Sequence, residues 1–309
     1  KLLVAATLVF EFDPSKCRLI LTRNNSQLYV KKRRSIELLT LSHFGVESGD
    51  TLHLIQYISD AAGKASSDLR GKVDKFGNIV GAEYDYGLDG GFTGLKVAVL
   101  QLCTAPECNI SLPTASLHQK GFAVHMWTSV PDLQEFQRVL KECCQLWVIS
   151  SHSNQLTHGH IEAIVSFFQE GKGLFLWGDN DPWYAEANLI GKQILSTTMF
   201  GSVPGGKSVP EKTDAAASGF FQHELTTGLK TLFEGITIAT IVPGPSVKPL
   251  MYGSAGNLVT AYSDEEGRRC IFDGGFTRLF CNWDEAGQPR FVVNCAAWLA
   301  NLESILSVE

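Results

Sequence analysis

The stretch Gly171-Lys172-Gly173-Leu174-Phe175-Leu176-Trp177-Gly178-Asp179-Asn180-Asp181 indicates the fold of this chain more clearly than any other. Its apolar run is short and ends abruptly in a polar turn, which is typical of a buried strand in a parallel sheet. The carboxyl end of such a strand lies at the edge where α/β proteins place their sites. We therefore predict that residues 178–181 lie at a functional edge.

The sequence on both sides of this stretch alternates between strand and helix patterns. Strands are expected at residues 95–102, 123–128, 145–150 and 173–177, with helices at 132–144 and 160–169. Later strands are expected at 237–242, 258–263 and 269–272, followed by a closing helix at 289–302. This order predicts a parallel sheet with helices on both faces.

The bulk composition limits the class of protein. With 309 residues and 44% hydrophobic content, the chain is long enough for two globular units with a sizeable core. The net charge of -6 comes from interspersed charges, and the basic run Lys31-Lys32-Arg33-Arg34 is short. We therefore expect no nucleic-acid partner. No apolar stretch has the roughly 18 residues of a membrane span, and residues 2–10 are too short for a signal peptide. A cytoplasmic protein without a membrane partner is expected.

The eight cysteines are scattered, and several lie inside apolar segments, which is typical of reduced core thiols. Cys103, Cys108 and His118 are residue types that bind metals. A single Cys-x4-Cys pair, however, lacks the second ligand pair of a zinc motif. We expect neither a metal nor a cofactor.

The first segment, residues 1–58, has strand-like alternation at 8–12 and 28–30, and a further strand at 50–56 after a turn at 47–49. Its segments 10–15, Leu28-Tyr29-Val30, 40–46 and Thr51-Leu52-His53-Leu54-Ile55 resemble successive motifs of ubiquitin, in the same order. The resemblance implies a β-grasp, ubiquitin-like domain. It also implies that Tyr29, His53 and Ile55 form an apolar patch for a ubiquitin-binding partner. The alternative is that these three are ordinary strand residues on a solvated face.

Two features depart from the ubiquitin pattern. Only residues 16–27 stand where the family has a long helix. Either the helix is much shortened, or Arg18-Leu19-Ile20-Leu21 is an extra strand, or the chain omits a segment. The chain also continues past residue 59 instead of ending at a Gly-Gly terminus, so conjugation to substrates is not expected.

Residues 59–93 are rich in Gly, Asp, Ser and Lys, which is typical of a linker. In the third segment, residues 94–309, several stretches look like the class I glutamine-amidotransferase-like fold, a flavodoxin-like parallel-sheet architecture. These stretches are 146–150, 171–174, 188–190, 223–229, 232–235 and 273–299. Among its branches, the segment is most similar to the trehalose-utilisation-type proteins and to the domain found in some intraflagellar-transport subunits.

An amidotransferase of this fold needs a cysteine thiolate at a strand-to-helix turn, a histidine to accept its proton, and backbone amides for the oxyanion. The turn here reads Trp177-Gly178-Asp179, and the position of the family's histidine reads Phe272-Asp273-Gly274. Both catalytic side chains are missing from these positions. We therefore expect no glutaminase activity.

Asp179 and Asp181 remain candidates, since two carboxylates at the carboxyl edge of a sheet can act as acid and base or bind a hard cation. Possible neighbours are His152, His158, His160, His223 and Asp273. The favoured alternative is that Asp181 caps a helix whose first residue is Pro182, which leaves Asp179 the freer carboxylate.

Two short motifs are weaker. Gly201-Ser202-Val203-Pro204-Gly205-Gly206-Lys207-Ser208 matches the phosphate-loop pattern letter for letter. Pro210 follows closely and residues 211–218 have no apolar face, so we expect a flexible surface loop without the helix that receives phosphate. Ser151-His152-Ser153 lacks the G-x-S-x-G turn of a serine nucleophile.

The sequence therefore predicts a non-catalytic interaction protein. It would join a ubiquitin-like module to a pseudo-amidotransferase domain that binds a partner or a small ligand. The alternative is a hydrolase of the same fold that uses Asp179, Asp181 and nearby histidines. Carboxylates and a histidine that converge on one open pocket would favour the hydrolase.

Overall fold

The computed structural model of the chain describes residues 17–21, 26–28, 52–56, 74–76, 80–81, 89–105 and 107–301. In the first three of these segments only the backbone is described. The chain divides into two compact units, Lys1–Ile79 and Val80–Glu309. Each unit is described by itself.

The first unit contains a three-stranded antiparallel sheet. Its central strand β1 (Cys17–Leu21) lies between β2 (Ser26–Leu28) and β3 (Leu52–Gln56). The register places Leu19 opposite both Leu28 of β2 and Leu54 of β3. Of the alternatives left open for this segment, the structure has the strand. The strands expected at 8–12 and 29–30 lie outside the described residues, and the ubiquitin-like fold stays a prediction.

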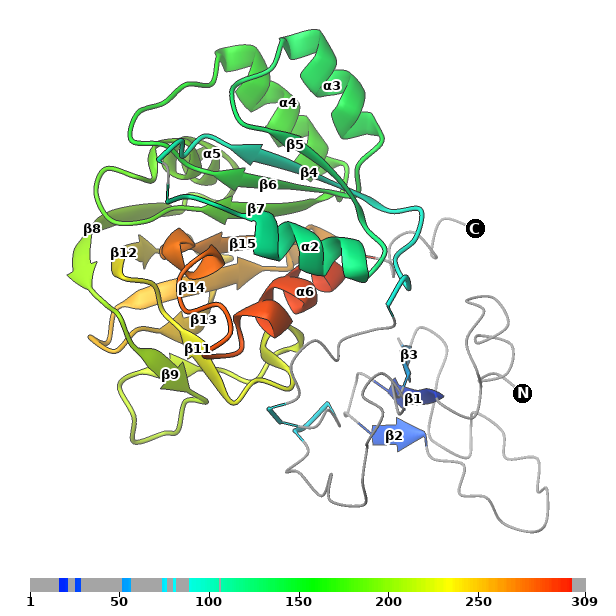
Figure 1. The fold of residues 1–309 in the computed structure, drawn as a ribbon, viewed down its shortest axis with the longest axis vertical. Helices are drawn as coiled ribbons and strands as arrows, with labels where there is room; N and C mark the ends of the chain where they lie inside the picture. The colour runs from blue at the N-terminus through cyan, green and yellow to red at the C-terminus, as the bar shows by residue number, and fades with distance from the viewer. Residues whose placement is uncertain are drawn as a thin grey trace, which may run out of the picture. The chain divides into compact units, whose positions relative to one another are not determined.

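The second unit is built on an eight-stranded sheet in the order β10-β13-β14-β15-β7-β6-β4-β5. Five of its strands are parallel: β4 (Lys96–Gln101), β5 (Ala123–Trp127), β6 (Gln145–Ile149), β7 (Gly173–Trp177) and β15 (Cys270–Asp273). Numbered along the chain, these five have the order 2-1-3-4-5 that is found in flavodoxin-like sheets. The predicted parallel sheet is confirmed over these strands (Figure 1).

The rest of the sheet departs from the purely parallel prediction. The strands β14 (Leu258–Ser263), β13 (Lys248–Tyr252) and β10 (Gly219–Phe220) extend it in antiparallel pairs. The reason is the short connection between β14 and β15, which holds only the turn η4 (Glu265–Gly267). A parallel neighbour would need a crossover of a dozen or more residues.

Two small antiparallel pairs lie outside the main sheet. The strand expected at 237–242 is β12 (Thr237–Val242), and it pairs with β8 (Thr198–Pro204). The second pair joins β9 (Ser208–Pro210) to β11 (Thr231–Phe233).

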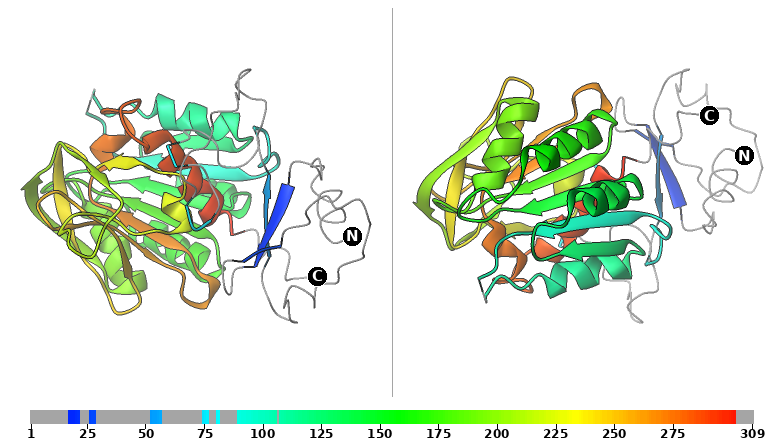
Figure 2. Two further views of the ribbon diagram at one scale, coloured as in Figure 1. Left: turned by 90° about the horizontal axis from the view of Figure 1, so that it is seen from below. Right: turned by 90° about the horizontal axis from the view of Figure 1, so that it is seen from above.

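Helices cover both faces of the main sheet, as predicted. On one face, α2 (Ser111–Gln119) and α6 (Gln288–Leu299) pack on side chains such as Val97 and Val99 of β4. The other face packs alternate residues of the same strand, Ala98 and Leu100, under α3 (Leu133–Lys141), α4 (His158–Gln169) and α5 (Ala185–Leu195). Strand side chains alternate between faces, so each strand contributes to both cores. The helices α2 and α6 lie next to each other on their face of the sheet (Figures 1 and 2).

The helix ends follow local sequence signals in part. Asp132 caps α3 by accepting from the Gln134 N–H, and Thr157 caps α4 by accepting from the His160 N–H. The two short helices η3 (Glu224–Thr226) and η5 (Phe276–Leu279) complete the second unit. Within the described residues, no helix has the length and apolar character needed to cross a membrane.

Candidate functional site

Gly178 directly follows β7 at the carboxyl edge, at the position where the predicted amidotransferase-like fold would carry a nucleophile. A Cβ atom built at Gly178 would lie 2.5 Å from Met199 Sδ and 2.9 Å from Tyr184 Cβ. The backbone of Gly178 is also used, because its N–H donates to Asp273 O and its carbonyl accepts from the Phe276 N–H. This position therefore has no room for a cysteine side chain.

Asp179, the next residue, is 3% exposed and points into the protein. Its Oδ1 atom has no hydrogen-bond partner within the described part of the chain. Burial raises the pKa of Asp179 to about 8, and the negative charge of Asp273 acts in the same direction. The carboxyl group is therefore mostly protonated at neutral pH, which makes it a poor general base and a poor cation ligand.

Asp273, at the end of β15, is held by three donors. Its Oδ2 atom lies 3.2 Å from Arg278 Nη1 and accepts from the Thr260 hydroxyl at 2.8 Å. Its Oδ1 atom accepts from the Gly275 N–H at 3.0 Å. Arg278 is itself buried and donates to the carbonyl of Glu234. This ion pair ties the β15 turn to η5, so Asp273 has a structural role.

Two buried thiols lie near Asp179 at the end of β4. A hydrogen bond with Cys108 lowers the pKa of Cys103 to about 7, while the same contact and burial raise the pKa of Cys108. The Cys103 charge adds to the effects that raise the pKa of Asp179. The Nδ1 atom of His118 bonds to Phe122 O at 3.1 Å. The described residues contain no group of three side chains suited to a metal ion.

The predicted helix cap at Asp181 is wrong. The helix α5 begins at Ala185, and Tyr184 is its N-terminal flanking residue. The peptide bond before Pro182 is cis, and Asp181 Oδ1 accepts a hydrogen bond from the Tyr184 hydroxyl at 2.6 Å. Asp181 is exposed, whereas Asp179 is buried. The two carboxylates thus differ in environment, and no contact between them is found in the described part of the chain.

The histidines do not gather around Asp179. His152 is exposed and packs edge-on against Trp183, whose carbonyl accepts from the Asp179 N–H. It is the candidate histidine placed at the same edge. His158 is exposed and pairs with Glu162 on α4.

The other two candidate histidines are structural. His160 is buried and bonds to the Thr157 hydroxyl and to Pro131 O. His223 packs against Trp298, whose carbonyl accepts from Arg269. Because Arg269 directly precedes β15, His223 lies toward the amino edge of the sheet, opposite Asp179.

The sequence did not single out Glu186, which holds the loop after β6. Glu186 lies in the first turn of α5 and is fully buried. Its carboxylate accepts from the Ser151 N–H at 2.7 Å, the Ser151 hydroxyl at 3.0 Å and the Gln155 N–H at 3.0 Å. The Ser151 hydroxyl is thus committed to Glu186 and to Ser153 O, not to a histidine. The sequence signal that could have identified Glu186 is an acidic residue on the apolar face of a helix, because a buried charge needs partners.

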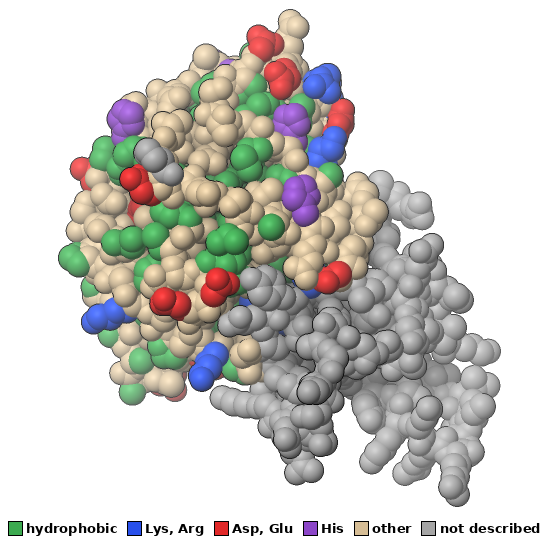
Figure 3. Space-filling view, viewed as in Figure 1, with side chains coloured by type: hydrophobic (Ala, Val, Ile, Leu, Met, Phe, Trp, Pro, Cys, Tyr) green, Lys and Arg blue, Asp and Glu red, His purple; other side chains and the backbone are tan. Residues whose placement is uncertain are grey.

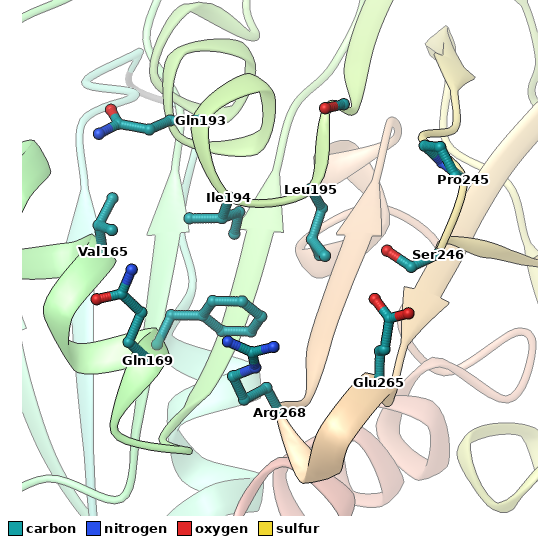
Figure 4. Close-up of a pocket in the computed structure, with 11 residues that line it drawn as sticks. Val165, Gln169, Gln193, Ile194, Leu195, Pro245, Ser246, Glu265 and Arg268 are labelled. Atoms are coloured by element: carbon teal, nitrogen blue, oxygen red, sulfur yellow. The ribbon is translucent and has the colours of Figure 1, made fainter.

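Two cavities are formed by other residues. One, of about 350 Å³, lies between the ends of α4 and α5 and the β14–β15 turn (Figure 4). Arg268 lines it and pairs with Glu266, at the amino edge of the sheet. A second cavity, of about 560 Å³, lies between α2 and the β4–β5 edge and touches Cys108. No candidate carboxylate of the sequence prediction lines either cavity.

The phosphate-loop match does not form a phosphate site. Its first residues belong to β8 and its last begins β9, so the expected flexible loop is only partly correct. The N–H groups of Gly205, Gly206 and Lys207 donate to Ile236 O, Gly235 O and Glu234 Oε1. A phosphate would need these same amides as donors, and here they already have acceptors within the protein.

The predicted patch of the first unit is only partly within the described residues. Tyr29 lies outside them. His53 and Ile55 lie in β3, opposite Ile20 and Arg18 of β1, and their side chains are not described. The patch therefore stays a prediction.

These features define the class: an α/β protein with a flavodoxin-like order of parallel strands, an antiparallel extension, and a closed carboxyl edge. The mmIFT52 N-terminal domain shares this fold, with a TM-score of 0.50 and 8% identity over 66% of this chain and 97% of that chain. The exo-beta-1,4-mannosidase Op5Man5 from Opitutaceae bacterium strain TAV5 matches with a TM-score of 0.40 and 10% identity over 69% of this chain and 36% of its own. No protein-family model and no curated protein matches the sequence.

At these identities the comparison shows the fold alone. It agrees with the expected resemblance to the domain found in some intraflagellar-transport subunits. The ubiquitin-like and amidotransferase parts of the resemblance stay predictions.

Proposed function

We propose that this chain is a non-catalytic interaction protein and that its α/β unit serves as a scaffold for a protein partner. The observation that carries the proposal is the closed carboxyl edge. Gly178 leaves no space for a nucleophile, and Asp179 is buried with a pKa raised to about 8. The fold match to the mmIFT52 N-terminal domain, an intraflagellar-transport component by its name, supports a scaffold role.

The finer parts of the proposal come from the sequence. They are a ubiquitin-like module at 1–58 with a patch of Tyr29, His53 and Ile55, a linker at 59–93, and a pseudo-amidotransferase domain at 94–309. The proposal also includes four expectations from the sequence. The protein uses no cofactor, it has no nucleic-acid partner and no membrane partner, and it is cytoplasmic.

The alternative hydrolase gains no support from the geometry. It requires Asp179, Asp181 and a histidine to converge on one pocket. Instead Asp179 is buried, Asp181 bonds to Tyr184, and His152 packs on Trp183.

A direct test is hydrolysis by the purified full chain. We expect no ammonia release from glutamine and no hydrolysis of a generic ester above the buffer rate, because the turn after β7 has Gly178 in place of a nucleophile, Asp179 is largely protonated, and the Cys103 thiol is buried and bonded to Cys108. Asp179→Asn is the diagnostic variant, and Glu162→Gln on the exposed face of α4 is its matched control. Turnover that Asp179→Asn removes and Glu162→Gln preserves would overturn the proposal.

A further inference from the structure

The strand β5 is an open edge of the main sheet. It pairs with β4 on one side, and no other described strand lies on its second side. The Ala123 N–H donates to Leu95 O, so Ala123, His125 and Trp127 direct their backbone groups toward β4. Successive residues alternate in direction, so the N–H and C=O groups of Val124 and Met126 point away from the sheet.

The helix α2 forms the wall of a groove beside this edge. The groove has a volume of about 560 Å³, and Met126 of β5 lines it on the strand side. Ser111, Thr114, Ala115 and His118 line it on the helix side. The spacing of these four is that of one helix face. The lining contains no Asp, Glu, Lys or Arg. An uncharged, largely apolar side chain is the group that this groove accommodates.

The two edges of the sheet differ in protection. Proteins blunt exposed edge strands with Lys, Pro, bulges, very short strands or a covering segment. At the opposite edge, β10 has two residues, and Phe220 accepts from the Lys212 N–H. The sequence of β5, Ala-Val-His-Met-Trp, has no Pro and no Lys, and its ladder with β4 has no bulge. The β5 edge therefore has none of these protections within the described residues.

We propose that the groove between β5 and α2 binds an extended peptide segment of a partner protein, which adds to the sheet as a further strand. The backbone of the peptide bonds to Val124 and Met126, and alternate apolar side chains enter the groove. This inference rests on the proposed interaction role and names its surface. The backbone groups require an extended chain, and the uncharged lining requires apolar side chains, which together define the partner segment.

A single extended segment fits this surface better than the edge of a second copy. In a β5-to-β5 dimer, each copy would place its own α2 on the groove side, next to the α2 of the other. The groove volume corresponds to a few side chains, not to a helix.

The test is a selection on the full chain. A phage-displayed library of linear peptides of about ten random residues is selected on the wild type, and an enriched peptide is synthesised for affinity measurement by fluorescence anisotropy. Ala115→Arg fills the groove. Leu112→Arg is the matched control, because Leu112 is also exposed on α2 but does not line the groove.

We expect enriched peptides with apolar residues at alternate positions. Ala115→Arg should weaken binding about tenfold or more, and Leu112→Arg should leave it unchanged. Hydrogen exchange of the Val124 and Met126 amides should slow when the peptide is bound. Val124→Pro removes the outward N–H at an edge position that tolerates proline, and should also weaken binding.

Three outcomes would overturn the inference: no enriched peptide, equal binding to Ala115→Arg, or unchanged exchange at Val124 and Met126. A concentration-dependent dimer in sedimentation that Ala115→Arg disperses would identify a second copy as the occupant instead. Hydrolytic activity would overturn the proposed function but not the peptide result. Failure of peptide binding in an inactive protein would overturn this inference alone.

Discussion

At the scale of single residues, two neighbours explain why the carboxyl edge is closed. Gly178 is required because a side chain there would collide with Met199 and Tyr184. Asp179 then points into the protein, where burial favours its neutral form. The protonation of Asp179 therefore contributes to the free energy of unfolding, and this contribution depends on pH.

The first residue-scale prediction concerns Asp179→Asn. The pKa of Asp179 is raised to about 8 in the folded chain, whereas the unfolded chain loses this proton near about pH 4. The folded state therefore holds a proton that the unfolded state has lost. Its stabilising effect is complete at low pH and is lost as the pH rises through about 8.

We expect the free energy of unfolding of the wild type to carry a contribution from Asp179 that falls by about 1.4 kcal/mol per pH unit between about pH 5 and pH 7. Urea unfolding at several pH values measures it. Asp179→Asn should remove this part of the slope, and Asp181→Asn, at an exposed position, should keep it. Equal slopes in the wild type and Asp179→Asn would show that this carboxyl group does not retain its proton.

At the scale of elements, the loop after β6 is positioned by a side chain from α5. Glu186 accepts two backbone N–H groups and one hydroxyl from residues Ser151 and Gln155. The loop and the helix therefore act as one unit. Removal of the acceptor would leave the buried Ser151 N–H without its partner and would remove the bonds from the Ser151 hydroxyl and the Gln155 N–H that hold the loop.

We expect Glu186→Ala to lower the free energy of unfolding by about 3 kcal/mol, because buried donors that lose their partner retain the cost of desolvation. Urea unfolding at one fixed pH measures the loss. Glu162→Ala is the control, since Glu162 is exposed on α4 and its pairing with His158 is worth little. A loss of less than about 1 kcal/mol for Glu186→Ala would contradict the structural role of Glu186.

At the scale of the whole molecule, the α/β unit begins before its first strand. Phe92 stacks on Phe122 with ring centroids 4.5 Å apart, and its N–H donates to Lys120 O. Asp89 lies 2.8 Å from the buried Lys120 amine. Gly81 donates to Gly228 O. The residues before β4 are therefore part of the packing of this unit.

The corresponding prediction compares two fragments. Residues 80–301 should unfold in one cooperative transition, because the unit has its own core. Residues 95–301 should be less stable by about 3 kcal/mol, since they lack the Phe92 stack and the Asp89 partner of the buried Lys120. Thermal and urea unfolding followed by circular dichroism measure both. Equal stability of the two fragments would place the start of the unit at β4.

Local sequence patterns predicted the order of most strands and helices in the α/β unit. The strand at Gly173–Trp177 is continuous and apolar because it is buried on both faces, and that pattern is visible without the fold. The residues of the turn after β7, Gly178 and Asp179, were also visible, because residue identity does not depend on the fold; that they replace an amidotransferase cysteine stays a prediction. The helix α2 was not expected, since its residues Ser111–Gln119 include proline and no regular apolar stripe.

The sequence by itself thus determined the alternation of strands and helices and the residue types of the turn after β7, because both are local properties of the chain. Only the tertiary structure decided that Asp179 is buried, that His223 lies away from it, and that β5 is an open edge. Burial, convergence and exposure depend on contacts between residues far apart in the sequence, and periodicity contains no information about them.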